Sequence, residues 1–186
     1  MRIATRHPDW ITGLIVQNAN FYEDGLQPMF VDLLRPLWEH RCGATEAPVL
    51  DLFEPEGTKM QYQTGAGQHA TINPDAWRHD QAGLDRPGNK LIQLELQANY
   101  HTNIEQYSNW HQYLKAHQPP TLVTWGQGDP LFGVENVRRL ESDLADVQTY
   151  VLDAGHFALE ERNDFIAARI REFFVPRLAS EASYSS

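Results

Sequence analysis

The chain has 186 residues, 41% of them hydrophobic and 22% charged, which is typical of one globular domain rather than a disordered segment. Its net charge of -10 argues against nucleic acid as a partner, because phosphate binding requires clustered Lys and Arg. No apolar run approaches the length of a membrane span, and the first ten residues are too polar for a signal peptide. The single cysteine, Cys42, excludes an internal disulfide, so we expect a cytoplasmic protein.

The first 17 residues are predicted to hold the end of a core helix and one strand. Ile3 and Ala4, followed by Arg6-His7-Pro8, resemble the last turns of a helix. Helices this short rarely stand alone, so we expect its beginning to lie outside this sequence. A buried strand is predicted over Thr12–Gln17, because TGLIVQ is short, apolar and bounded by turn residues.

Residues 18–118 contain no convincing strand and no internal repeat. Helical pieces are predicted at Met29–His40, Asn89–Ala98 and Ile104–His117. We expect Pro36 to interrupt the first of them, and Pro119–Pro120 marks the return to the sheet. A helical insertion between two strands of one sheet is typical of a cap or lid. We therefore interpret residues 18–118 as a cap or lid.

The segment 119–178 is predicted to form the C-terminal core. Its two strands, Thr121–Trp125 and Val147–Leu152, are joined by an amphipathic helix over Val134–Leu144. Strand, helix and strand with short connections predict a parallel pair with a right-handed crossover. The mostly apolar TLVTW indicates a strand covered on both faces, whereas the alternation in VQTYVL places it nearer an edge.

One more amphipathic helix is predicted at the end of the chain, over Glu160–Phe174. Its apolar stripe consists of Phe165, Ile166, Ile170, Phe173 and Phe174. We expect Pro176 to stop this helix, since a proline in a helix interior removes a hydrogen bond and clashes with the preceding turn. Residues 179–186 are then expected to form a disordered tail.

Two titratable side chains follow the two core strands, each just past the strand's carboxyl end. Asp129 lies in GQGDP and His156 in DAGHF. If the strands are neighbours about 4.8 Å apart, these side chains can meet at the edge where ligands bind in open parallel sheets. The carboxylate would fix one imidazole tautomer and leave the other ring nitrogen free as a base. Each residue alone fits an ordinary turn or loop, but their joint placement favours a functional pair.

Three segments resemble the α/β-hydrolases, with haloalkane dehalogenases, epoxide hydrolases and small esterases as the nearest group in pattern. TLVTWGQGDPLF and VLDAGHFALEERNDFIAARIREFF resemble the acid and histidine segments, and RHPDWITGLIVQNAN resembles a helix and the sixth strand. The resemblance implies an α/β fold: the C-terminal part of an α/β-hydrolase, with about three parallel strands, flanking helices and a helical cap. It also implies that Asp129 is the triad acid and His156 the general base.

The sequence departs from this family at the nucleophile. No small-x-nucleophile-x-small elbow occurs, and neither Ser108, Ser142 nor Cys42 has the preceding strand or small neighbours that an elbow needs. By resemblance the elbow belongs shortly before Met1, and the oxyanion-hole amides are missing with it. Because losing a triad nucleophile costs on the order of a millionfold in turnover, we expect this chain alone to be inactive.

Further candidates for the substrate pocket are Asn20, Phe132 and Phe157, although capping of the strand end is the slightly favoured role for Asn20. No metal site is predicted, because the eight histidines lack H-E-x-x-H or a comparable paired spacing. No cofactor is predicted either, since the glycines at 65–67 do not lie between a strand and a helix.

Three functions remain open from the sequence. The first is a truncated hydrolase whose intact parent attacks a small ester, epoxide or haloalkane. The second is one half of a split enzyme completed by another chain, and the third is a non-catalytic ligand-binding or interaction module. In the first two cases, the strand at Thr12–Gln17 is an exposed edge that invites a partner chain or self-association. Neither nucleic acid nor a membrane is expected as a partner.

Overall fold

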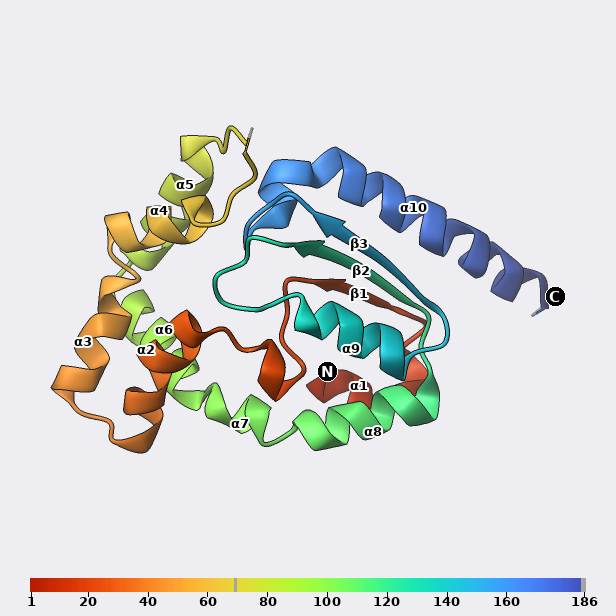
Figure 1. The fold of residues 1–186 in the computed structure, drawn as a ribbon, viewed down its shortest axis with the longest axis horizontal. Helices are drawn as coiled ribbons and strands as arrows, with labels where there is room; N and C mark the ends of the chain where they lie inside the picture. The colour runs from red at the N-terminus through yellow and green to blue at the C-terminus, as the bar shows by residue number, and fades with distance from the viewer. Residues whose placement is uncertain (69, 185–186) are drawn as a thin grey trace.

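Three parallel strands form the centre of the computed structural model, which describes residues 1–68 and 70–184 (Figure 1). They are β1 (Leu14–Gln17), β2 (Thr121–Gly126) and β3 (Val147–Leu152), in the order β1-β2-β3. Leu14 pairs with Thr121, which pairs with Val147. All of β2 is buried, because the other two strands flank its edges and helices cover both of its faces. The predicted α/β class and parallel βαβ unit are therefore confirmed, although β1 begins at Leu14 rather than Thr12.

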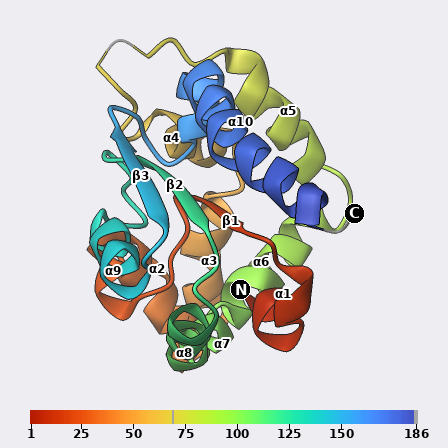
Figure 2. The same cartoon turned by 90° about the vertical axis from the view of Figure 1, so that its right-hand side faces the viewer.

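Helices cover both faces of the sheet (Figure 2). Their bounds are α1 (Arg2–Arg6), α2 (Pro28–Glu39), α3 (Gly43–Asp51), α4 (Pro55–Gln63), α5 (Pro74–Leu84), α6 (Asn89–Asn99), α7 (His101–Ile104), α8 (Tyr107–His117), α9 (Glu135–Asp143) and α10 (Ala158–Tyr184), with 3-10 turns at Pro8–Trp10 and Glu23–Gly25. Side chains alternate along a strand, so Val16, Val123 and Trp125 share one face and enter the core with side chains of α8 and α9. The other face of β2 contacts α10.

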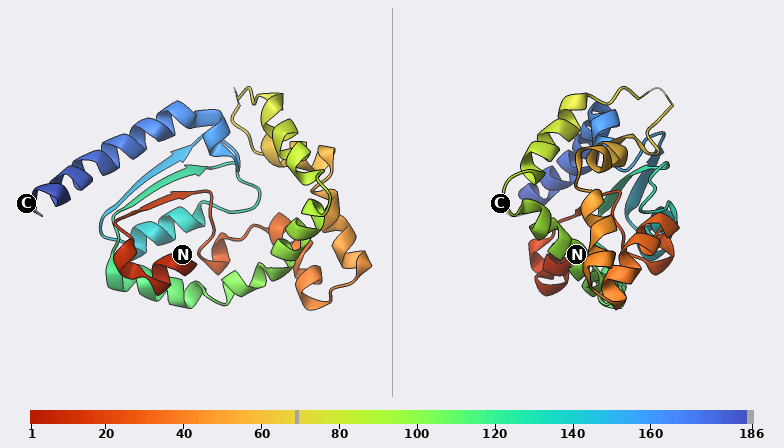
Figure 3. Two further views of the ribbon diagram at one scale, coloured as in Figure 1. Left: turned by 180° about the vertical axis from the view of Figure 1, so that it is seen from behind. Right: turned by 90° about the vertical axis from the view of Figure 1, so that its left-hand side faces the viewer.

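The segment between β1 and β2 is helical, as predicted: α2 to α6 lie beyond the carboxyl ends of the strands, whereas α8 runs back along one face of the sheet (Figure 3). Its helices α2, α3 and α6 bury an apolar cluster of their own, built on Phe30, Leu34, Leu37, Val49, Phe53 and Leu94. The predicted interruption at Pro36 is wrong, since α2 runs unbroken through it. Burial of Leu34 and Leu37 on either side of the proline stabilises the helix and offsets the one backbone hydrogen bond lost.

The predicted end of the last helix at Pro176 is also wrong, because α10 extends from Ala158 to Tyr184. Arg177 follows the proline and donates a 2.7 Å hydrogen bond from its guanidinium to the Phe173 carbonyl. It also pairs with Asp146 at 2.9 Å, which ties this part of α10 to the turn before β3. Residues 185 and 186 of the predicted tail lie outside the described residues.

A loop of the helical segment packs directly against the loop after β2. Gly65 has a left-handed φ of 74°, and a Cβ at this position would lie 1.7 Å from the Gly128 carbonyl oxygen. The two backbones therefore touch at a point where no side chain fits. Across the described part of the chain, no helix has the length and apolar character needed to cross a membrane.

Substituting Gly65→Ala is expected to lower the free energy of unfolding by about 2 to 4 kcal/mol, because the new methyl group combines a strained φ with steric overlap. Gly83, inside α5, has open space around its Cβ position. Gly83→Ala is the matched control and should leave stability unchanged or raise it by up to about 1 kcal/mol. Urea unfolding of both variants checks this, and equal stabilities would show that the loop contact is not tight.

Candidate catalytic site

Asp129 and His156 meet at the carboxyl edge of the sheet, as their positions after β2 and β3 predict. Nδ1 of His156 lies 2.8 Å from Oδ2 of Asp129. The Asp129 side chain is 1% exposed, whereas the His156 side chain is 19% exposed. The carboxylate is thus shielded from water while part of the imidazole remains accessible, which is the arrangement needed for a base that acts on a bound molecule.

The Asp129 carboxylate receives hydrogen bonds from four donors. Oδ1 accepts from the backbone amides of Leu131 at 2.8 Å and Phe132 at 3.1 Å. Oδ2 accepts from the Asn18 side-chain amide at 2.8 Å, in addition to its contact with His156. A carboxylate only accepts hydrogen bonds, so each of its four partners acts as the donor. Nδ1 of His156 must therefore carry the proton, and Nε2 of the neutral ring keeps a free lone pair.

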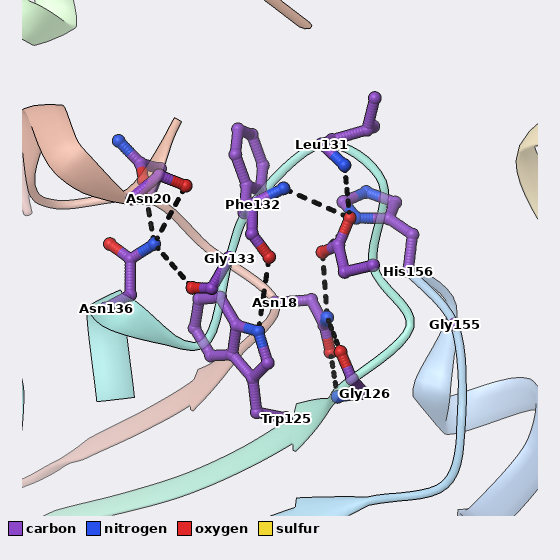
Figure 4. Close-up of polar contacts among 12 residues, drawn as sticks. Asn18, Asn20, Trp125, Gly126, Leu131, Phe132, Gly133, Asn136, Gly155 and His156 are labelled. Atoms are coloured by element: carbon purple, nitrogen blue, oxygen red, sulfur yellow. Dashed lines mark hydrogen bonds and ion pairs between the residues drawn. The ribbon is translucent and has the colours of Figure 1, made fainter. Parts of the chain in front are cut away.

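Asn18 orients the acid, a role that the sequence analysis did not assign to it. Its Oδ1 accepts from the Gly126 amide at 2.9 Å (Figure 4). This bond fixes the orientation of the side chain and leaves Nδ2 to donate to Asp129. Asn18 is 6% exposed and has a φ of 41°. Asparagine tolerates this left-handed conformation better than most residues. An asparagine directly after a predicted strand was therefore the sequence signal for a residue that turns the chain at the strand end.

Aromatic rings surround the exposed part of His156. The rings of Phe132 and Phe157 meet the imidazole edge-on, with centroids 5.6 Å and 5.0 Å away. Tyr62 from α4 stacks on Phe157 at 4.1 Å and bonds to Asp80 through its hydroxyl. Burial, and then this hydrogen bond, raise the pKa of the Tyr62 phenol, so it stays protonated at neutral pH. The histidine therefore faces an apolar wall.

Asn20, the third pocket candidate, lies in a separate buried polar cluster. Its Nδ2 donates to the Tyr107 hydroxyl at 2.6 Å and the Tyr22 carbonyl at 2.8 Å, while its Oδ1 accepts from Asn136 at 2.8 Å. Asn136 is 0% exposed and also accepts from the Phe21 amide. This network joins the chain after β1 to α9 and to α8. The structure therefore brings Phe132 and Phe157 to His156 but places Asn20 elsewhere.

An apolar cavity opens beside the acid loop. Its walls come from α2, from the α3–α4 region and from the acid loop, and consist of Met29, Leu33, Leu52, Met60, Gln61, Pro130 and Leu131. Leu131 connects it to the site, because its backbone amide bonds to Asp129. A wider hollow lies along α8 and α9, where Lys115 and Arg139 give it a charged rim. The apolar cavity has a volume of about 20 Å³, so it is a small gap in the packing beside the acid loop.

The sequence-level nucleophile candidates lie apart from this pair. Ser108 lies on α8 and Ser142 on α9, where both line the charged hollow. Cys42 is the N-terminal cap of α3, and hydrogen bonds from Thr45 lower the pKa of its thiol. Among residues 1–68 and 70–184, no hydroxyl or thiol is hydrogen-bonded to the His156 ring, and no group of three His, Cys, Asp or Glu residues could hold a metal ion.

Removing the Asn18 side chain is expected to destabilise the acid loop. Asn18→Gly keeps the left-handed backbone accessible but strips the Gly126 amide of its acceptor, and should lower the free energy of unfolding by about 1 to 3 kcal/mol. Asn163→Ala, at an exposed position of α10, should change it by less than about 0.5 kcal/mol. Chemical denaturation measures the free energy of unfolding of both variants. An unchanged value for Asn18→Gly would show that Asn18 does not hold the acid loop in place.

Comparison with known proteins shows what this chain is similar to. No protein-family model matches the chain. A curated relative, the uncharacterized hydrolase YNR064C of Saccharomyces cerevisiae, is 32% identical over 176 residues. The match covers 93% of this chain and 61% of the yeast protein. The chain thus spans about three fifths of the length of that relative.

Solved structures with the same fold include three hydrolases. Haloalkane dehalogenase DbeA from Bradyrhizobium elkani matches with a TM-score of 0.70 and 18% identity, over 96% of this chain and 63% of that one. A putative lipase from Acinetobacter baumannii matches with a TM-score of 0.64 and 16% identity, over 97% of this chain and 56% of the lipase. The 2-hydroxy-6-oxo-6-phenylhexa-2,4-dienoate hydrolase of a Rhodococcus strain matches with a TM-score of 0.61 and 16% identity, over 93% of this chain and 58% of that hydrolase. The chain therefore has the fold of the C-terminal part of an α/β-hydrolase, as the sequence resemblance predicts.

Proposed function

We propose that this chain is the acid and histidine part of a hydrolase that cleaves a small ester, epoxide or haloalkane. In this proposal Asp129 is the acid and His156 the general base of a triad whose nucleophile lies outside residues 1–186. The observation that supports it best is the 2.8 Å contact between the Asp129 carboxylate and His156 Nδ1. Placement of the pair at the carboxyl ends of two adjacent parallel strands adds support, since ligands bind at that edge.

In the proposed reaction, His156 moves the proton. Its Nε2 accepts a proton from the attacking group or from a water molecule, which makes the ring an imidazolium. The Asp129 carboxylate then stabilises that positive charge through Nδ1 without taking the proton itself. The amides of Leu131 and Phe132 hold the carboxylate in place during this step, because both bond to Oδ1.

The helical segment between β1 and β2 serves, in this proposal, as a cap that supplies the substrate pocket. The rings of Phe132 and Phe157 flank the imidazole, and Tyr62 of α4 in this segment stacks on Phe157. Such a lining favours the apolar part of a small substrate and keeps water away from the reacting bond. It offers few charged partners, so strongly charged substrates are disfavoured.

The nucleophile is proposed to arrive on a strand–elbow–helix unit that adds beside β1, either from the same polypeptide or from another chain. Within the described residues, β1 pairs on one side only, with β2. Ile15 of β1 is 47% exposed, although its strand lies in the sheet. A neighbouring strand and its helix would satisfy the free backbone groups of β1 and cover this apolar surface.

Activity is expected only when the missing part of the fold is supplied. Residues 1–186 alone should hydrolyse p-nitrophenyl butyrate no faster than buffer. A fusion carrying the unmatched part of the Saccharomyces relative ahead of Met1 should gain turnover, and His156→Ala should then reduce it by on the order of 10⁴-fold or more. His79→Ala, at an exposed histidine of α5, is the matched control and should leave it unchanged.

Two outcomes would contradict the proposed function. Ester turnover by residues 1–186 alone, abolished by His156→Ala, would mean that the chain holds its own nucleophile. A well-folded fusion that stays inactive, or remains active with His156→Ala, would favour a non-catalytic ligand-binding module instead.

The free edge of β1 predicts that residues 1–186 self-associate when nothing covers it. Sedimentation at increasing concentration should reveal oligomers, and Ile15→Lys should shift them toward monomer, because a lysine on an edge strand opposes pairing. Leu91→Lys, at a position of α6 that is 61% exposed, is the control and should have little effect. A monomer at every concentration would argue against a missing neighbour for β1.

A further inference from the structure

Glu161 lies at a break in the helix that follows the catalytic histidine. Helix α10 begins at Ala158, but Arg162 has a φ of -133° and a ψ of 27°, which are not helical values. The first turn is therefore separate from the long remainder of the helix. The side chains of Glu161 and Arg162, at this break, both bond to the backbone of the histidine loop, at Gly155 and Asp153.

The Glu161 carboxylate bridges two loops that are far apart in the sequence. Oε1 accepts a 2.6 Å hydrogen bond from the amide of Gly155, the residue before His156. Oε2 accepts a 2.8 Å hydrogen bond from the amide of Gly67, in the loop between α4 and α5. A single carboxylate thus joins the histidine loop to the helical segment, with each oxygen serving one glycine amide.

Asp153 and Arg162 reinforce the same junction. The Asp153 carboxylate accepts from the Gln68 amide at 3.2 Å, and its backbone carbonyl accepts from the Arg162 guanidinium at 3.0 Å. The backbones meet closely here, since a Cβ on Gly67 would lie 2.4 Å from the Asp153 carbonyl oxygen. The carboxylates of Glu161 and Asp153 therefore accept hydrogen bonds from loop amides that have no partner within a helix or strand.

We propose that Glu161 is a positioning residue that keeps His156 in register with the helical cap. The inference rests on the proposed function, in which His156 is the base and the cap supplies the pocket. Because Gly155 directly precedes His156, its amide bond to Glu161 fixes the backbone from which the imidazole extends. Because Gly67 belongs to the cap, its bond to the same carboxylate makes a shift of the cap loop move the histidine loop as well.

A general helix-stabilising effect is the ordinary alternative, since an acidic residue in a first turn interacts favourably with the helix dipole. Glu160 provides the comparison, because it lies in the same first turn but is exposed. A dipole effect would be shared by Glu160 and Glu161, whereas a bridge to Gly67 and Gly155 belongs to Glu161 alone. Substituting each residue in turn separates the two.

Amide hydrogen exchange of residues 1–186, followed by NMR, tests the bridge without any activity. In Glu161→Ala, the amides of Gly67 and Gly155 should exchange roughly 10- to 100-fold faster, because both lose a charged acceptor. Glu161→Gln retains one acceptor oxygen and should give an intermediate result. Amides of β2 should be unchanged, the His156 ring signals should broaden, and Glu160→Gln should match the wild type.

Three results would overturn the proposal: unchanged exchange at Gly67 and Gly155, faster exchange across the whole sheet, or the same response in Glu160→Gln. Glu161→Gln keeps the test valid if Glu161→Ala does not fold. In the active fusion, Glu161→Ala should lower kcat by on the order of 10-fold. If His156→Ala leaves the fusion active, the proposed function fails, and the exchange result still decides whether Glu161 couples the two loops.

Discussion

The buried carboxylate of Asp129 is the constraint on which the candidate site depends. A charge with 1% side-chain exposure is costly unless hydrogen bonds replace its lost water. Asp129 receives them from three directions: Asn18 after β1, its own loop after β2, and His156 after β3. The ends of all three strands are therefore tied to one side chain, and the geometry of the imidazole follows from that arrangement.

The helical segment is built into the site rather than merely attached beside it. Leu26 forms a β-bridge with Phe132, so the chain after β1 holds the acid loop from the other side. Gly65 and Gly67 let the loop after α4 approach the acid and histidine loops at backbone distance. Glu161 then satisfies the amides exposed by that approach. Packing around His156 thus combines residues of the strand-end loops with residues of the helical segment, and Phe132 packs against both apolar clusters.

Sequence patterns were sufficient for the strands and the Asp129–His156 pair because parallel strands bring their carboxyl ends to one edge. They failed at Pro36 and Pro176, where tertiary contacts outweigh the local effect of a proline. Asn18 and Asn20 both follow β1, and spacing alone could not show which one turns toward the acid. Glu161 was beyond prediction from sequence, since its role depends on Gly67, which only the folded chain brings to it.

The tautomer of His156 tests the proposed pair most directly, because the Asp129 carboxylate can hold the imidazole only through a protonated Nδ1. Nitrogen-15 NMR of the imidazole at neutral pH should show a protonated Nδ1 and a bare Nε2, and Asp129→Ala should remove this preference. A neutral ring protonated mainly at Nε2, unaffected by Asp129→Ala, would contradict the account, since the base would then lack its free lone pair.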